Sequence, residues 1–288
     1  LSRHLIPIRH APVPEHQNCR EFGPSVALAN MMSLRPKIDE LRCFANDIKP
    51  DLMSLTETWV YDDTASEYHL HLPGYNLCLK NRKSGVHGGV GLYINNTIKF
   101  KALTDLHHPE LEVLWVHLRP TRLPRGFPCI VSGTVYHTLY PDGASDAAMI
   151  EYLLFSLTTI EGRYPGCGIL LTGDFNRLNI SRLLTQFKLK QLVRVPTRGD
   201  QTLDLIITNM PQLYNKDLVQ TFPPFGLSDH SVVLLEPKSR SMRNTSSRRS
   251  FTQRDTRPSR KRELGRYLGS IDWSVLDSVP DCESKLQL

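Results

Sequence analysis

The stretch "GILLTGDFNRLN", residues 168–179, joins an apolar strand to a pair of polar residues. Ile169–Leu171 predicts a buried strand, and Asp174 and Asn176 follow it two residues apart. In an extended chain residues i and i+2 point to the same side, so the carboxylate and the amide can share one small volume. Gly173 allows the backbone to bend there. Asp-x-Asn is also a common turn sequence, because both side chains bond local backbone, and this stretch alone leaves both interpretations open.

Polar residues also accompany five other predicted strands. Each of them alone is compatible with a turn, a cap or a solvated loop. Asp204 differs, because it lies inside an apolar segment where a carboxylate is costly without a partner. Ligand sites of open α/β sheets lie at strand ends, so the joint occurrence predicts one site. The strands and their polar residues are Val26–Ala29 with Asn30, Leu52–Leu55 with Glu57, Ile130–Val135 with Tyr136 and His137, Leu203–Thr208 with Asp204, and Val232–Leu235 with Asp229 and His230.

Apolar residues at three- and four-residue steps predict two helices. The first carries Ile38, Leu41, Phe44 and Ile48 on one face, with Ser33 as its N-cap and Pro36 in its first turn. The second covers Met149–Ile160. Strands separated by helices predict a layered α/β domain over residues 24–236. Further strands are predicted over Gly89–Ile94 and Val113–Leu118.

The net charge of +6 is concentrated near the C-terminus. Residues 238–266 hold eleven Lys and Arg against two acids, whereas residues 1–237 sum to zero. A nucleic-acid interaction inferred from the pI of about 9.0 therefore concerns the tail. The alternative is that the tail is only a solvated spacer between two domains.

The regions outside the α/β domain have few apolar residues to bury. Residues 1–23 are predicted to be a disordered leader, and residues 237–263 a basic disordered linker. Residues 264–288 are expected to begin a helical linker toward a missing downstream domain. The chain begins with Leu and without a signal-peptide pattern, so we expect a monomeric domain of a longer polyprotein.

Composition excludes several classes of protein. With 40% hydrophobic and 22% charged residues, the chain is typical of a globular protein with a sizeable core. Its best apolar run, Met149–Ile160, is too short to span a bilayer and carries Glu151, so no membrane partner is expected. The six cysteines show neither C-x-x-C nor zinc spacing, which predicts free thiols in a reducing compartment, nuclear or cytoplasmic.

The order and spacing of these segments resemble the endonuclease/exonuclease/phosphatase superfamily. More narrowly, they resemble the endonuclease domain at the front of non-LTR retrotransposon polyproteins. The resemblance covers roughly residues 26–236, and the tail "KRELGRYLGSIDWSVL" resembles the linker that precedes a reverse transcriptase in such polyproteins. The segments that carry it are "ANMMSLRPKIDEL", "LMSLTETW", "HGGVGLYI", "VYH", "LLTGDFN", "VPTRGDQTLDLIIT" and "LSDHSVV".

The resemblance implies a four-layer α/β sandwich, with two mixed sheets packed face to face and helices outside. It also implies Mg²⁺-dependent phosphodiester hydrolysis, with Mn²⁺ as an alternative metal. The resemblance implies Glu57 as the main carboxylate ligand of the metal, with Asn30 and Asp229 close to the metal. It implies that Asp174 orients or deprotonates the attacking water and that Asn176 holds this water or a phosphate oxygen. His230 would contact a phosphate oxygen with Asp204 supporting its ring, and Tyr136 would contact the phosphate or aid proton movement.

The chemistry of metal-dependent phosphodiester hydrolysis favours the same types of residue independently of the resemblance. Mg²⁺ prefers carboxylate and amide oxygens, and an aspartate behind a histidine favours the imidazolium that stabilises an oxyanion. What the resemblance implies is a DNA endonuclease that nicks DNA for a retroelement, and we expect Lys80, Arg82, Lys83 and Arg198 as its DNA-binding residues. The alternatives are abasic-site repair or phosphatase action by the same chemistry, and an inactive retroelement fragment that only binds DNA.

Overall fold

The computed structural model describes residues 23–61, 69–82, 87–121, 123–138, 143–215, 217, 219–238 and 258–274. The chain divides into two compact units, with the division between Met242 and Arg243. The predicted leader, apart from Gly23, lies outside the described residues, as do residues 239–257 of the predicted linker. Among the described helices, none has the length and apolarity needed to cross a membrane.

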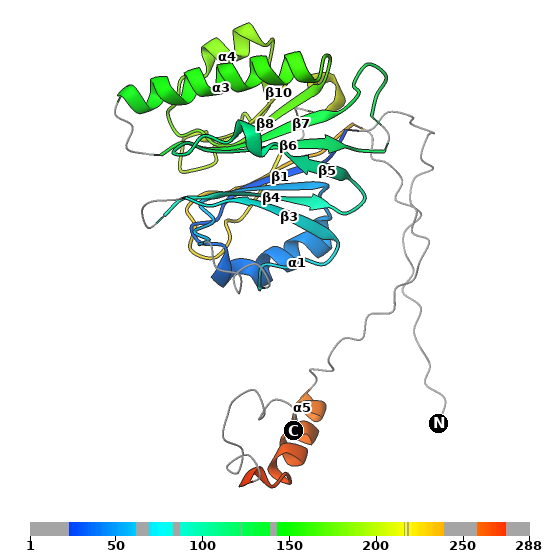
Figure 1. The fold of residues 1–288 in the computed structure, drawn as a ribbon. Helices are drawn as coiled ribbons and strands as arrows, with labels where there is room; N and C mark the ends of the chain where they lie inside the picture. The colour runs from blue at the N-terminus through cyan, green and yellow to red at the C-terminus, as the bar shows by residue number, and fades with distance from the viewer. Residues whose placement is uncertain are drawn as a thin grey trace. The chain divides into compact units, whose positions relative to one another are not determined.

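Two six-stranded mixed sheets form the first unit (Figure 1). In the first sheet β1 and β2 are parallel, and the other neighbours are antiparallel. Its strand order is β11 (Gln220–Phe222), β12 (Val232–Leu235), β1 (Val26–Asn30), β2 (Leu52–Thr56), β4 (Val90–Asn95) and β3 (Tyr75–Lys80).

The second sheet repeats this arrangement around its own parallel pair, β7 and β8. All other neighbours in it are antiparallel. Its order is β5 (Lys99–Ala102), β6 (Glu112–Arg119), β7 (Ile130–Tyr136), β8 (Gly168–Asp174), β10 (Asp204–Thr208) and β9 (Lys190–Gln191).

Three apolar clusters separate the layers. One lies between the sheets and combines residues such as Leu28 and Leu92 of the first sheet with Leu114 and Leu170 of the second. A second packs α3 (Gly143–Arg163) and α4 (Ser181–Gln186) on the outer face of the second sheet, and a third packs α1 (Ile38–Ile48) on the first (Figure 1). The predicted four-layer sandwich is confirmed.

The strand register sets the position of the polar strand ends. Tyr136 pairs with Asp174 across β7 and β8, and Asp174 pairs with Asp204 across β8 and β10. These three side chains therefore form one row at the same edge of the second sheet. In the first sheet Asn30 pairs with Thr56, immediately before Glu57.

Some local predictions were wrong. Ser33 does not cap a helix: its φ is +82°, and α1 begins at Ile38 after a 3₁₀ turn over Arg35–Lys37. The proline at 36 fits that turn instead, because its fixed φ suits a helical start. The sequence pattern also missed β3, β5, β9 and β11. β5 is mostly exposed, and β9 and β11 are very short. β3 is half-buried, with Tyr75, Leu77 and Leu79 packed against the apolar cluster under α1.

The boundaries near the C-terminus also differ from the prediction. Pairing in the first unit continues beyond Glu236, because Pro237 bridges to Tyr214 and the Lys238 N–H donates to the Leu213 carbonyl. In the second unit α5 covers Pro258–Gly269, so it begins inside the segment predicted to be linker.

Candidate active site

Asp174 lies at the centre of the polar strand ends and is 1% exposed. The backbone N–H of Asn176 donates to its Oδ1 at 3.0 Å, and Asn30 Nδ2 donates to its Oδ2 at 3.0 Å. Asn176 has a φ of +48°, a left-handed conformation that asparagine tolerates better than most residues. The Asp-x-Asn stretch is thus both a local turn and part of the polar cluster.

The surroundings of Asp174 favour its protonated form. Burial, followed by the nearby charge of Asp204, raises the pKa of Asp174 to about 7. His230 and the hydrogen bonds from Asn176 and Asn30 act in the opposite direction. A carboxyl group with a pKa near neutrality is suited to exchange a proton with water.

His230 and Asp204 form a buried hydrogen-bonded pair. His230 Nδ1 lies 2.7 Å from Asp204 Oδ2, and the two side chains are 2% and 0% exposed. Burial acts to lower the pKa of His230, but the hydrogen bond and charge of Asp204, with Asp174 and Asp229, raise it above its usual value. The Nε2 atom lies 3.9 Å from Asp174 Oδ2, so the imidazole reaches the centre of the cluster.

Glu57 contacts the same side-chain nitrogen of Asn30 as Asp174 does. Asn30 Nδ2 donates to Glu57 Oε1 at 2.9 Å, and Trp59 Nε1 donates to Oε2 at 3.3 Å. One amide therefore links the carboxylates of Glu57 and Asp174. The Asn30 oxygen accepts the Met32 N–H at 3.2 Å, so this amide turns its nitrogen, and not its oxygen, toward the carboxylates.

Tyr136 completes the row on the second sheet and is 8% exposed. Burial, then the Glu57 carboxylate and the nearby Asp174, raises the pKa of the Tyr136 phenol. The hydroxyl therefore stays protonated at neutral pH and is a hydrogen-bond donor. The Arg82 guanidinium lies over the ring, 5.9 Å from its centroid.

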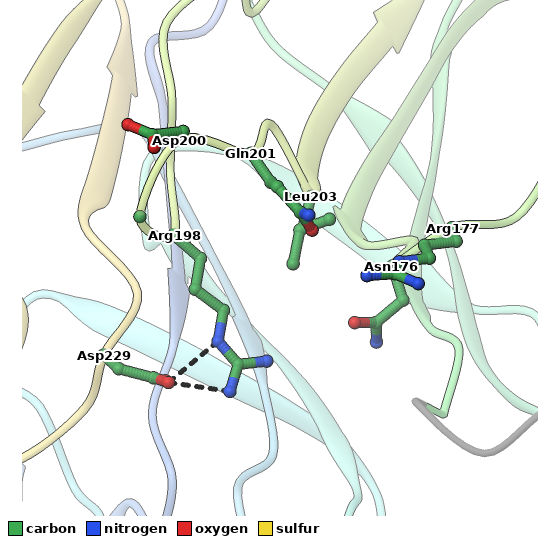
Figure 2. Close-up of a pocket in the computed structure, with 8 residues that line it drawn as sticks. Asn176, Arg177, Arg198, Asp200, Gln201, Leu203 and Asp229 are labelled. Atoms are coloured by element: carbon green, nitrogen blue, oxygen red, sulfur yellow. Dashed lines mark hydrogen bonds and ion pairs between the residues drawn. The ribbon is translucent and has the colours of Figure 1, made fainter.

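Asp229 lies at the rim of the cluster, and its side chain is 51% exposed. Arg198 binds its Oδ2 through Nε at 2.8 Å and Nη2 at 2.7 Å (Figure 2). Its Oδ1 is 3.8 Å from His230 Nε2. A pocket of about 540 Å³ adjoins this pair, and it is lined by Asn176, Arg177, Arg198, Gly199, Asp200, Gln201, Leu203 and Asp229.

The oxygen-rich cluster fits a hard divalent cation better than a soft one. Among the described residues, Asp174, Asp204 and His230 hold ligand atoms within 4.8 Å of one another. The 2.7 Å bond between His230 Nδ1 and Asp204 Oδ2 leaves Asp204 Oδ1 without a hydrogen-bond partner among the described residues. Glu57, with Asp229 near the rim, offers further carboxylate oxygens.

The sequence model of the Endonuclease/Exonuclease/phosphatase family matches residues 18–258. The chain belongs to the endonuclease/exonuclease/phosphatase family. Phosphodiester hydrolysis of the nuclease type and use of a divalent metal are typical of this family. Among curated proteins, none matches the chain at a significant level.

Solved structures of several nucleic-acid enzymes share the fold of this family member. AP endonuclease LMAP from Leishmania major is 17% identical, with a TM-score of 0.57 over 74% of this chain and 86% of that one. The endonuclease domain of TRAS1, a telomere-specific non-LTR retrotransposon, is 15% identical, with a TM-score of 0.53 over 74% and 96%. A 3'-5' exonuclease from Neisseria meningitidis is 16% identical, with a TM-score of 0.51 over 74% and 99%. At these identities the similarity shows a common fold.

Three of the four candidate DNA-binding residues have internal partners among the described residues. Lys80 donates to the carbonyls of His108 and Leu111, and Arg82 forms a bidentate pair with Glu112 at 3.0 and 2.7 Å. Lys80 thus holds the loop before β6 and Arg82 the first residue of β6, so a role in DNA binding stays a prediction for them. Lys83 lies outside the described residues, and Arg198 faces the pocket beside Asp229.

The sequence interpretation assigned no role to three residues around the polar cluster. Trp59 holds the Glu57 carboxylate, and Lys37 donates to the carbonyls of Met31 and Met32 behind Asn30. His137 joins the ends of β7 and β8, because its N–H donates to the Asp174 carbonyl at 2.9 Å. Trp59 and His137 stand directly in the quoted segments "LMSLTETW" and "VYH", whereas no local signal marks Lys37.

Proposed function

We propose that this chain is a Mg²⁺-dependent endonuclease that nicks one strand of duplex DNA for a non-LTR retroelement, with Mn²⁺ as an alternative metal. The observation that supports hydrolysis is the position of Asp174. Its carboxylate accepts hydrogen bonds from the Asn30 side chain and the Asn176 backbone N–H, and it lies beside the Asp204–His230 pair. The fold shared with the TRAS1 endonuclease domain and the retroelement-like tail sequence support the narrower part.

The residues divide the work of hydrolysis. Asp174 takes a proton from the attacking water, and the water oxygen forms a bond to phosphorus. The bond between phosphorus and the leaving sugar oxygen breaks, and the leaving oxygen takes up a proton. The imidazolium of His230, favoured by Asp204, lies 3.9 Å from Asp174 and stabilises charge on a phosphate oxygen. The protonated Tyr136 hydroxyl donates a hydrogen bond to the same phosphate.

Glu57, supported by Asn30 and Trp59, would hold the metal, with Asp229 near it. When bound, a divalent cation supplies positive charge that stabilises the phosphoryl group and acidifies water. Asn30 acts in this arrangement by orienting the two carboxylates, since its oxygen already accepts the Met32 N–H.

The DNA backbone is expected to reach the cluster through the pocket beside it. Arg177 and Arg198 line this pocket, and Figure 2 shows Arg198 directed to Asp229. Phosphate contacts of arginine position a duplex without reading its sequence. The pair with Asp229 keeps the Arg198 guanidinium within the pocket where a phosphate would lie.

Incubation with supercoiled plasmid and Mg²⁺, with and without a chelator, tests the proposal. We expect nicked circles with metal and none with chelator or with Glu57→Gln. An intact plasmid together with cleavage of an abasic oligonucleotide would instead support abasic-site repair, the alternative favoured by the fold shared with LMAP. If the wild type cleaves neither substrate, the proposed nuclease activity is contradicted, and the interpretation as an inactive fragment that only binds DNA is supported.

A further inference from the structure

A second histidine–aspartate pair lies beside the candidate active site, with a buried histidine and an aspartate whose side chain is 40% exposed. His137 follows the last residue of β7 and is 2% exposed. Its Nε2 lies 2.7 Å from Oδ1 of Asp146, which belongs to the first turn of α3. The pair thus ties the end of β7 to the start of the helix that covers the sheet.

The main chain of His137 contacts both polar residues at the end of β8. Its N–H donates to the Asp174 carbonyl at 2.9 Å, which continues the parallel pairing of Tyr136 with Asp174. Its carbonyl accepts a short hydrogen bond from Asn176 Nδ2. The position of His137 therefore fixes which way the Asn176 amide is turned.

This contact leaves the Asn176 oxygen without a hydrogen-bond donor of its own. The residue is 8% exposed, and Oδ1 is buried without a hydrogen-bond partner among the described residues. The opposite orientation of the amide would place Oδ1 against the His137 carbonyl, two acceptors facing each other. A buried acceptor left unpaired is costly, and a water molecule that donates to it removes that cost.

We propose that His137 and Asp146 form a positioning pair that holds the Asn176 amide with its oxygen toward the reacting centre, where it accepts a hydrogen bond from the attacking water. The inference rests on the proposed hydrolytic function. Between holding water and holding a phosphate oxygen, it assigns the Asn176 oxygen to water, because this buried acceptor needs a donor and a phosphate diester oxygen is itself an acceptor. Misplacing the water by about 1 Å would lower turnover by roughly 10²-fold.

Kinetic measurements on variants of the full chain test the pair. His137→Ala and Asp146→Ala should each lower kcat for plasmid nicking by roughly 10²-fold with little change in KM. Asp146→Asn should recover most of the activity, because its amide oxygen still accepts a hydrogen bond from the imidazole. Asp105→Ala is the matched control: it removes a 2.6 Å contact between a loop and Arg163 at the far end of α3, and it should turn over as the wild type does.

The Asn176 side-chain amide gives a second measurement that needs no substrate. Its two N–H signals in a ¹⁵N NMR spectrum are identified by their loss in Asn176→Ser. In the wild type one proton should be shifted downfield and exchange slowly, and in folded His137→Ala and Asp146→Ala both features should disappear, whereas Asp105→Ala should keep them.

An unshifted amide in the wild type, or wild-type kcat in His137→Ala, would overturn the proposal. So would an equal loss of kcat in Asp105→Ala, since it would mean that any α3 contact matters. If the wild type leaves the plasmid and the abasic oligonucleotide intact while the amide behaves as expected, the proposed function fails and the positioning pair stands.

Discussion

His230 Nδ1 and Asp204 Oδ2 lie 2.7 Å apart in a site where both side chains are almost fully buried. Asp204 comes from β10 and His230 precedes β12, so the contact crosses from one sheet to the other. An imidazolium and a carboxylate in this geometry stabilise each other against the cost of burial. The pair thereby keeps a positive charge available next to Asp174.

Asp204→Asn should therefore lower the pKa of His230 while leaving the hydrogen bond in place. The asparagine oxygen still accepts from Nδ1, but it does not stabilise the imidazolium. We expect turnover to fall by at least about 10²-fold, with metal affinity nearly unchanged. NMR titration of the His230 ring and calorimetric metal titration check this; a matching loss of metal affinity would identify Asp204 as a ligand instead.

The stability of the protein should depend on the protonation of Asp174. Its pKa is about 7 in the folded chain against 3.8 ordinarily, so between these values only the folded state holds the proton. The free energy of unfolding of the wild type, relative to Asp174→Asn, should therefore fall as the pH rises from about 4 to about 7 and then level off.

Urea unfolding of both proteins in metal-free buffer measures this difference at each pH. Asp105→Asn is the control, because the hydrogen bond from Arg163 lowers the pKa of Asp105 and moves its titration below this range. A difference between wild type and Asp174→Asn that does not vary with pH would show that Asp174 has an ordinary pKa.

Gly173→Ala should disrupt both the fold and the site. Gly173 has a φ of +147°, and a Cβ atom there would lie 1.8 Å from the Val135 carbonyl oxygen of the neighbouring strand. Because backbone cannot move aside cheaply, we expect a loss of about 3 kcal/mol or failure to fold. Gly162→Ala on α3 meets nothing within 4 Å and should stabilise by about 0.5–1 kcal/mol. Thermal unfolding compares the two; equal midpoints would contradict the packing argument.

Removal of catalytic side chains should be strongly non-additive. Glu57→Ala, Asp174→Ala and His230→Ala should each lower nicking by about 10³-fold or more, and double variants should be little worse, because the residues act as one unit. The linked contacts of Asn30 with Glu57 and Asp174 motivate this. Single-turnover assays with circular dichroism as a folding control test it; full activity in a folded single variant would remove that residue from the site.

The basic tail gives a prediction about salt. The net charge of residues 1–237 is zero and that of residues 238–266 is +9, so DNA affinity should depend on the tail. Each phosphate contact contributes about −0.9 to the slope of log K against log salt. A chain ending at Lys238, the last described residue of the first unit, should show a slope flatter by several contacts. Fluorescence anisotropy with Ca²⁺ in place of Mg²⁺ measures both chains; equal slopes would identify the tail as a spacer.

The local pattern was sufficient for the buried core strands and the layered class of the fold. Strands such as Ile130–Tyr136 and Val232–Leu235 are short apolar runs bounded by polar residues, and burial on both faces leaves that pattern in the sequence. The edge strand Lys99–Ala102 shows no such apolar pattern, because its side chains are mostly exposed and its position is set by pairing with β6.

The sequence by itself also determined which polar residues stand at strand ends, since that depends only on period and order along the chain. Their orientation depended on tertiary structure. The register that aligns Tyr136, Asp174 and Asp204, and the direction in which the Asn30 amide faces, come from contacts between segments far apart in sequence. A one-residue slip of β8 would turn Asp174 away from the cluster, and the packing of β8 against the other sheet and against the outer helices opposes it.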